Sequence, residues 1–255
     1  MGKLITKIKS LKVVNSGVIK KVKDKLYYKY ISPKAEKKTD EYREEILEKF
    51  GRICKGKHWL LMCGSLLRYY RDNTMDGQDL DFYVLREDFE KIKNKFFDEG
   101  FTIKQVFINE KNVISEYKFG YKDCEVDVFV FDKLKKDYTH RFTMEKDNSK
   151  DMKKTVVGNT QIITGKDFVS YERILHYLGE TTDYKYKNVT FKGPKKIEEA
   201  INDIYGENWT CYDPSYDPRT CPKNNVPIEH PNATSYVFIK PLTNYEAIYK
   251  DIKNS

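Results

Sequence analysis

Apolar and polar residues follow two different periods along the chain, and together these periods predict an α+β protein. Apolar side chains three or four positions apart predict a helix over residues 40–50, with Thr39 as its N-cap and Gly51 at its end. Alternating or unbroken apolar runs predict strands, because side chains along a strand point to opposite faces in turn. The expected strands cover residues 58–63, 79–85, 101–108, 113–121, 124–131, 140–144 and 155–163, and the further helices cover residues 87–98, 167–178, 195–205 and 245–252.

The order of these elements predicts three parts. Residues 1–35 form an N-terminal arm, and residues 36–165 form a core in which a small mixed β-sheet is flanked by helices. Residues 166–255 are expected to be a helical and loop-rich distal part that completes the site of the core. Within that part, residues 207–235 are rich in Pro, Asn, Asp and Thr and predict a long loop.

Composition limits the classes of binding partner that we expect for the chain. The 255 residues carry a formal net charge of +8, most of it from lysine. Because bidentate base contacts favour arginine, we expect no nucleic-acid partner, and a polyanionic substrate or an anionic membrane suits the charge better. The five cysteines are widely spaced, and we find no signal peptide or membrane-spanning apolar run. A reducing, cytoplasmic location is therefore expected.

The first 30 residues combine an apolar helical stripe with many lysines and one acid, Asp24. A basic amphipathic segment of this kind can lie on an anionic membrane surface, which would give the protein peripheral contact with the inner membrane face. An ordinary helix packed on its own domain, with its lysines in solvent, explains the same pattern.

Three carboxylates carry the candidate chemistry. Asp79 and Asp81 are two residues apart on one expected strand, so their side chains share a face, and Asp127 lies on a later strand. Carboxylate oxygens are the ligands that Mg²⁺ prefers, and the sequence therefore predicts a site for Mg²⁺ or Mn²⁺. Asp127 is also a candidate acceptor for the proton of an attacking hydroxyl group.

A Gly-Ser turn followed by a short helix stands opposite these carboxylates. Gly64 leaves room for a phosphate near the backbone, Ser65 can donate a hydrogen bond to it, and the N-terminus of a helix favours anions. Arg71, about two turns into that helix, can neutralise a phosphate oxygen. Two alternatives stay open: an Asp-x-Asp on a solvent-facing strand can arise by chance, and Cys211, Cys221 and His230 can hold a structural zinc ion.

In these residues the chain resembles the LicD/fukutin-type phosphotransferases. The segment GSLLRYYR at residues 64–71 resembles the opening of that family's site, and DLDF at residues 79–82 resembles its close. EVDVF at residues 125–129 resembles the family's third-acid strand, and residues 193–209 resemble its distal element. The loop at residues 74–78 departs from the family, because it is shorter and lacks the run of aspartates that Asp76 partly replaces.

This resemblance implies a nucleotidyltransferase fold and a specific transfer reaction. A phosphocholine, phosphoethanolamine, glycerol phosphate or ribitol phosphate unit would pass from a CDP-linked donor to a sugar hydroxyl of a cell-surface glycan, teichoic acid or capsule. Tyr205 and Trp209 are candidates for substrate contact, for example in an aromatic cage for choline, although core packing explains them too. A nucleotidyltransferase that modifies RNA or protein and a basic binding module on an inactive fold are the alternatives.

Overall fold

The computed structural model describes residues 32–77, 79–122, 124–145, 152–165, 168–211, 216, 225–226, 228 and 233–253. The expected basic arm over residues 1–30 lies outside the described residues, as do Cys221 and His230 of the alternative zinc site.

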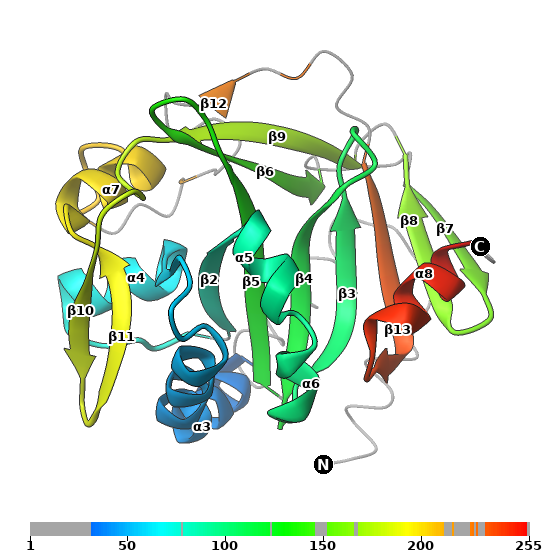
Figure 1. The fold of residues 1–255 in the computed structure, drawn as a ribbon, viewed down its shortest axis with the longest axis horizontal. Helices are drawn as coiled ribbons and strands as arrows, with labels where there is room; N and C mark the ends of the chain where they lie inside the picture. Colours follow the sequence, from blue (N-terminus) through cyan, green and yellow to red (C-terminus); the bar gives the residue numbers. More distant parts are fainter. Residues whose placement is uncertain are drawn as a thin grey trace, which may run out of the picture.

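The architecture is mixed α/β, with a curled and mostly antiparallel sheet and a few helices (Figure 1). The helices are α3 (Ser32–Ile53), α4 (Cys63–Asp72), α5 (Arg86–Ile92), α6 (Lys95–Asp98), α7 (Ile197–Tyr205) and α8 (Tyr245–Lys253). The strands are β1 (Trp59–Leu61), β2 (Asp79–Leu85), β3 (Thr102–Ile108), β4 (Ile114–Tyr121), β5 (Cys124–Lys133), β6 (Tyr138–Glu145), β7 (Lys153–Val157), β8 (Thr160–Thr164), β9 (Phe168–Leu175), β10 (Thr181–Tyr186), β11 (Val189–Pro194), β12 (Asn225–Val226) and β13 (Thr234–Leu242).

One sheet of eleven strands organises the described residues, in the order β12-β9-β6-β5-β4-β3-β13-β8-β7. Strand β2 pairs with β5 in parallel and with β1 antiparallel, away from that path. The hairpin of β10 and β11 is separate and packs against α3 and β1. A mixed sheet with helices is thus present as expected, but it is not small. The C-terminal part of the described chain contributes strands β9 to β13 and is not mainly helical and loop-rich, as the sequence had predicted.

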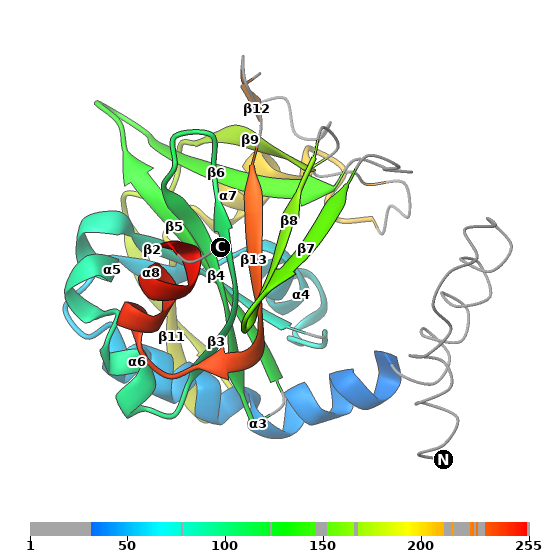
Figure 2. The same cartoon turned by 90° about the vertical axis from the view of Figure 1, so that its right-hand side faces the viewer.

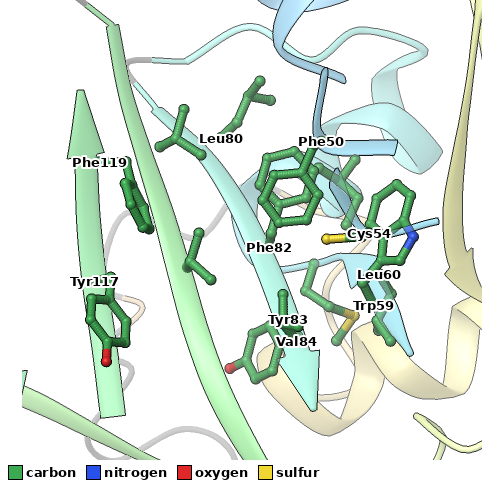
Figure 3. Close-up of a cluster of buried hydrophobic side chains, with 14 of the residues drawn as sticks. Phe50, Cys54, Trp59, Leu60, Leu80, Phe82, Tyr83, Val84, Tyr117 and Phe119 are labelled. Carbon is green, nitrogen blue, oxygen red and sulfur yellow. The ribbon is translucent and has the colours of Figure 1, made fainter. Parts of the chain in front are cut away.

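The core lies on the face of the sheet that α3, α5 and α6 cover (Figure 2). Leu80, Phe82 and Val84 of β2 alternate with the acids of that strand and are buried beneath α3 (Figure 3). Phe50 of α3 stacks on Phe82, with 3.7 Å between ring centroids. Burial of large side chains such as these is the main stabilising contribution to the fold, so the apolar face of β2 holds that strand, and its acids, in place.

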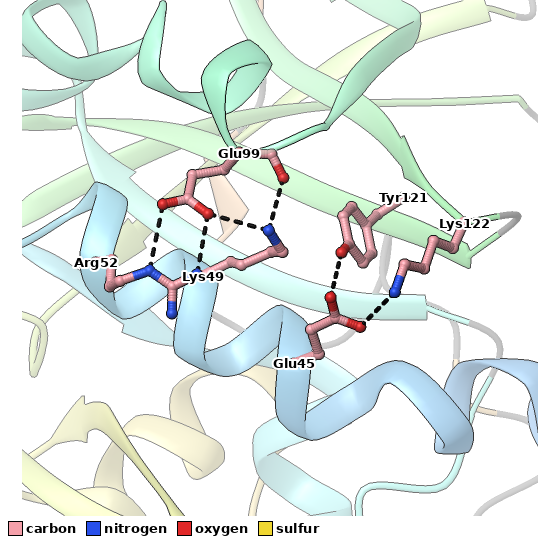
Figure 4. Close-up of polar contacts among 6 residues, drawn as sticks. All are labelled: Glu45, Lys49, Arg52, Glu99, Tyr121 and Lys122. Carbon is pink, nitrogen blue, oxygen red and sulfur yellow. Dashed lines mark hydrogen bonds and ion pairs between the residues drawn. The ribbon is translucent and has the colours of Figure 1, made fainter.

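Ion pairs anchor α3 across the ends of the strands (Figure 4). Glu99 accepts hydrogen bonds from Lys49 at 3.0 Å and from Arg52 at 2.9 Å, and these two cations lower the pKa of its carboxyl to about 2. One turn earlier, Glu45 accepts hydrogen bonds from Tyr121 and Lys122 at the turn between β4 and β5. Such partly exposed pairs stabilise little individually, so their role is to set where α3 lies.

Two of the expected elements are wrong in kind or in extent. Residues 167–178 do not form a helix, because β9 occupies this segment and pairs with β6 along its whole length. Its aromatic and β-branched residues fit a half-buried strand once a partner is present, whereas their spacing alone also fits a helix. The first helix begins at Ser32, so Thr39 lies inside it and is not its N-cap, and it runs past Gly51 to Ile53.

Other differences concern segments whose pairing is distant in sequence. The expected helix over residues 87–98 is two short helices, α5 and α6. Strand β13 was not expected, yet it pairs with both β3 and β8 inside the sheet. Residue 165 was the expected boundary between the core and the distal part, and strands from both sides of it join one sheet. No helix in the described part of the chain has both the length and the apolar character needed to cross a bilayer.

Candidate metal centre

The parallel pairing of β2 with β5 brings the three predicted aspartates together. Asp81 lies directly opposite Asp127 in the register, and Asp79 lies opposite Glu125. Because alternate residues of a strand share a face, Asp79, Asp81 and Asp127 all project from the face opposite the apolar core. One carboxylate oxygen of each lies within 4.8 Å of one from each of the other two.

The start of α4 closes this group of acids on one side. The Ser65 hydroxyl lies 3.3 Å from Asp81 Oδ2 and accepts a hydrogen bond from the Asp81 backbone N–H at 3.2 Å. The Met62 N–H donates to the Asp81 carbonyl oxygen at 3.0 Å, so β1, α4 and β2 are joined at this point. Gly64 and Ser65 are in the first turn of α4 rather than in a turn before it. Cys63, beside Gly64, has a φ of 52°, a left-handed conformation that is uncommon outside glycine.

Burial and mutual repulsion disturb the ionisation of these acids. Burial, followed by the charges of Asp79 and Asp127, raises the pKa of Asp81 to about 8. Burial also raises the pKa of Asp127 to about 6, although the neighbouring Lys118 opposes this shift. Raised carboxyl pKa values mean that the folded chain gives these negative charges too little compensation.

Asp127 uses its two oxygens in different ways. Oδ2 accepts a hydrogen bond from Lys118 Nζ at 2.7 Å, whereas Oδ1 is buried and has no hydrogen-bond partner. A buried carboxylate oxygen without a partner is costly, and a divalent cation satisfies such an atom. With three carboxylate oxygens and no soft ligand, this donor set fits Mg²⁺ or Mn²⁺.

Lys118 and Glu116 extend the charged group onto β4. Lys118 is the register partner of Asp127, and Glu116 lies two residues before Lys118 on the same face of β4. Burial raises the pKa of Glu116 to about 8, and its carboxylate lies 3.8 Å from the Lys118 ammonium. Sequence reasoning missed both residues as site residues, because only the β4–β5 register places them beside Asp127.

Arg68 is a further residue that the sequence analysis did not select. A Cβ atom at Gly77 would lie 2.3 Å from Arg68 Nη2, and one at Gly64 would lie 3.1 Å from Nη1, so two glycines make room for this guanidinium. Its charge lowers the pKa of Asp81, and its Nε is buried without a hydrogen-bond partner. No local signal in the sequence marks Arg68, because Gly77 comes to lie beside it only in the folded chain.

The predicted Arg71 points elsewhere. Its guanidinium binds Asp72 at 2.8 and 2.9 Å and lies 3.5 Å from the Trp209 carbonyl oxygen. The Trp209 ring in turn lies 5.7 Å from that of Tyr70. Among the described residues we find no contact between Arg71 and the three aspartates, so Arg68 is the arginine that the structure brings to them.

The two remaining predicted residues, Tyr205 and Asp76, differ in burial. Tyr205, the last residue of α7, is close enough for Asp81 and Cys63 to add to the effect of burial, which raises its pKa well above the ordinary value. Asp76 is exposed, and its backbone N–H donates to the Thr74 hydroxyl at 2.8 Å. Of these two, Tyr205 is the one on which Asp81 acts electrostatically.

No known family model matches the chain. A search of curated proteins likewise finds no significant match.

Proposed function

We propose that the protein is a Mg²⁺- or Mn²⁺-dependent phosphotransferase with a nucleotidyltransferase fold. Its reaction would move a phospho-alcohol unit from a CDP-linked donor to a sugar hydroxyl of a cell-surface glycan, teichoic acid or capsule. One observation carries the proposal: Asp79, Asp81 and Asp127 present oxygens within 4.8 Å of one another beside the first turn of a helix. The resemblance of the surrounding segments to LicD/fukutin-type phosphotransferases supports the choice of donor.

The charges around the site favour a divalent cation. Asp79, Asp81, Asp127 and Glu116 bring four carboxylates to one face, and two cationic side chains, Lys118 and Arg68, act on them. A fifth acid, Glu125 opposite Asp79, is balanced by Lys104 at 3.6 Å. Apart from that pair, two negative charges are left when the four acids are ionised, since four carboxylates face two cations. A bound divalent ion would balance them and would neutralise charge that develops on a transferring phosphoryl group.

The side chains around the proposed ion would have different roles. Asp79, Asp81 and Asp127 would hold the ion, and Ser65 fixes Asp81 through its hydroxyl. Because Lys118 occupies Asp127 Oδ2, only Oδ1 is left, and we assign it to the ion rather than to proton transfer. Arg68 lies in the middle of α4, but its guanidinium reaches back to Gly64 in the first turn, where it would neutralise a donor phosphate.

The proposal is tested with the full chain and four donors, CDP-choline, CDP-ethanolamine, CDP-glycerol and CDP-ribitol. With Mg²⁺, one donor should raise the melting temperature and release CMP when a glycan acceptor is added. Asp79→Asn should abolish CMP release, whereas Asp98→Asn, which changes an exposed acid of α6, should not.

Two results would count against the proposal. Pyrophosphate release from a nucleoside triphosphate, with the nucleotide joined to RNA or protein, would show nucleotidyl transfer instead. Unchanged turnover in Asp79→Asn would mean that the carboxylates are not the reaction centre.

A further inference from the structure

The Lys118 ammonium lies between two buried acids of the sheet. Its Nζ is 2.7 Å from Asp127 Oδ2 on β5 and 3.8 Å from Glu116 Oε1 on β4. The side chains of Asp127 and Glu116 are 7% and 6% exposed. Two buried carboxylates on neighbouring strands therefore share this one cation.

Asp127 is also the central member of a row across three strands. Asp81 flanks it on β2, and Lys118 flanks it on β4. Neighbouring strands are about 4.8 Å apart, and the two ions of two-metal phosphoryl-transfer sites are about 3.5–4 Å apart. An ion held between β2 and β5 and an ammonium held between β5 and β4 would therefore have nearly the separation of a metal pair.

The bonding of Asp127 separates these two positions. Oδ2 is taken by Lys118, and the buried Oδ1 has no partner. A salt bridge that served stability alone would be expected to satisfy both oxygens, because an unpaired buried oxygen is destabilising. One oxygen is thus committed to the ammonium, and the other is free for an ion shared with Asp79 and Asp81.

We propose that Lys118 is a built-in second cation: its ammonium occupies the position of a second metal ion between Asp127 and Glu116, and the site binds one divalent ion. This inference rests on the proposed metal site and sets its stoichiometry. Lys118 is then a positioning residue, because it fixes the orientation of Asp127 and supplies a permanent positive charge one strand away from the ion.

The number of bound Mn²⁺ ions, measured by electron paramagnetic resonance on the full chain, tests the proposal. The wild type should bind one ion, and so should Lys118→Arg, which keeps the charge. Lys118→Ala leaves Asp127 and Glu116 with space between them and should bind two. Lys118→Met is the matched control: it removes the charge but fills the space, so it should bind one.

Two further measurements sharpen the test. The double variant Lys118→Ala with Glu116→Gln should return to one ion, because the second position loses an acid. Because Lys118→Met removes the charge beside the ion, it should lose about 100-fold in turnover. Activity of Lys118→Ala should recover as Mn²⁺ concentration rises, and Lys118→Arg should retain most of its turnover.

The outcomes separate this inference from the proposed function. Two ions in the wild type, or one ion in a folded Lys118→Ala, would overturn the role of Lys118 and leave the metal-dependent function standing. No ion in the wild type would overturn both. If Lys118→Ala does not unfold cooperatively, Lys118→Ser replaces it, and the wild-type count remains decisive in either case.

Discussion

Replacing Asp81 with asparagine should stabilise the metal-free protein while it removes a ligand of the proposed ion. Asp81 is 9% exposed and lies beside two other acids. Its neutral isostere keeps a carbonyl oxygen that can still accept from Ser65, so the contact between β2 and α4 should survive. The substitution therefore removes repulsion without creating a cavity.

The size of the effect follows from the pKa of Asp81, which rises from an ordinary 3.8 to about 8. Below pH 4 the Asp81 carboxyl is protonated in both the folded and the unfolded chain, so its charge does not change the free energy of unfolding. Above pH 4 the unfolded chain ionises first, and the folded state loses stability until pH 8, where it ionises as well. An isolated carboxyl with this shift would destabilise the protein by about 6 kcal/mol, at 1.36 kcal/mol per unit.

The increase in the free energy of unfolding on Asp81→Asn should be smaller than this, because the three aspartates titrate together and Asp79 and Asp127 share the repulsion with Asp81. We expect Asp81→Asn to raise the free energy of unfolding by at least about 2 kcal/mol at pH 8. For a chain of this length such a gain corresponds to an increase of about 4–8 °C in Tm.

Urea and thermal unfolding in EDTA, at pH 4 and pH 8, measure this effect, with Asp98→Asn as the control for loss of an exposed charge. The stabilisation by Asp81→Asn should be present at pH 8 and nearly absent at pH 4. Addition of Mg²⁺ should reduce the stability advantage of Asp81→Asn over the wild type, because only the wild type keeps all three ligands of the proposed ion. A variant less stable than the wild type at pH 8, or a gain independent of pH, would refute the reasoning.

Three other predictions address the ion, the arginine and the core. Mg²⁺ at 100 times its dissociation constant should stabilise the wild type by about 2.7 kcal/mol in thermal unfolding, and Asp79→Asn should lose this effect. Gly77→Ala should displace Arg68, since the new Cβ would lie 2.3 Å from Nη2, and should lower turnover; Gly51→Ala, whose new Cβ would meet only Trp59 at an ordinary 3.9 Å, should not. Phe50→Ala should cost about 3–5 kcal/mol in urea unfolding, because its buried ring stacks on the sheet; a loss below 1 kcal/mol would contradict that packing.

The core strands and the three aspartates could be predicted from the sequence because their signals are local. Strand β2 alternates acid and apolar residues, so its own period shows that Asp79 and Asp81 share a face opposite Leu80 and Phe82. The same alternation in β5 selects Asp127. A period of two residues follows from the geometry of an extended chain and needs no knowledge of the neighbouring strand.

The partners of these acids could not be predicted in this way, since they depend on register and on contacts distant in sequence. Lys118 faces Asp127 only because β4 pairs with β5 in this register. Arg68 lies at the site only because the loop at Gly77 folds back beside its guanidinium. Strand β9 was mistaken for a helix for the same reason: its spacing fits both forms, and pairing with β6 decides between them. Burial and strand pairing are properties of the assembled sheet, so the charge balance around the aspartates, and with it the proposed place of Lys118, emerged only when that sheet was complete.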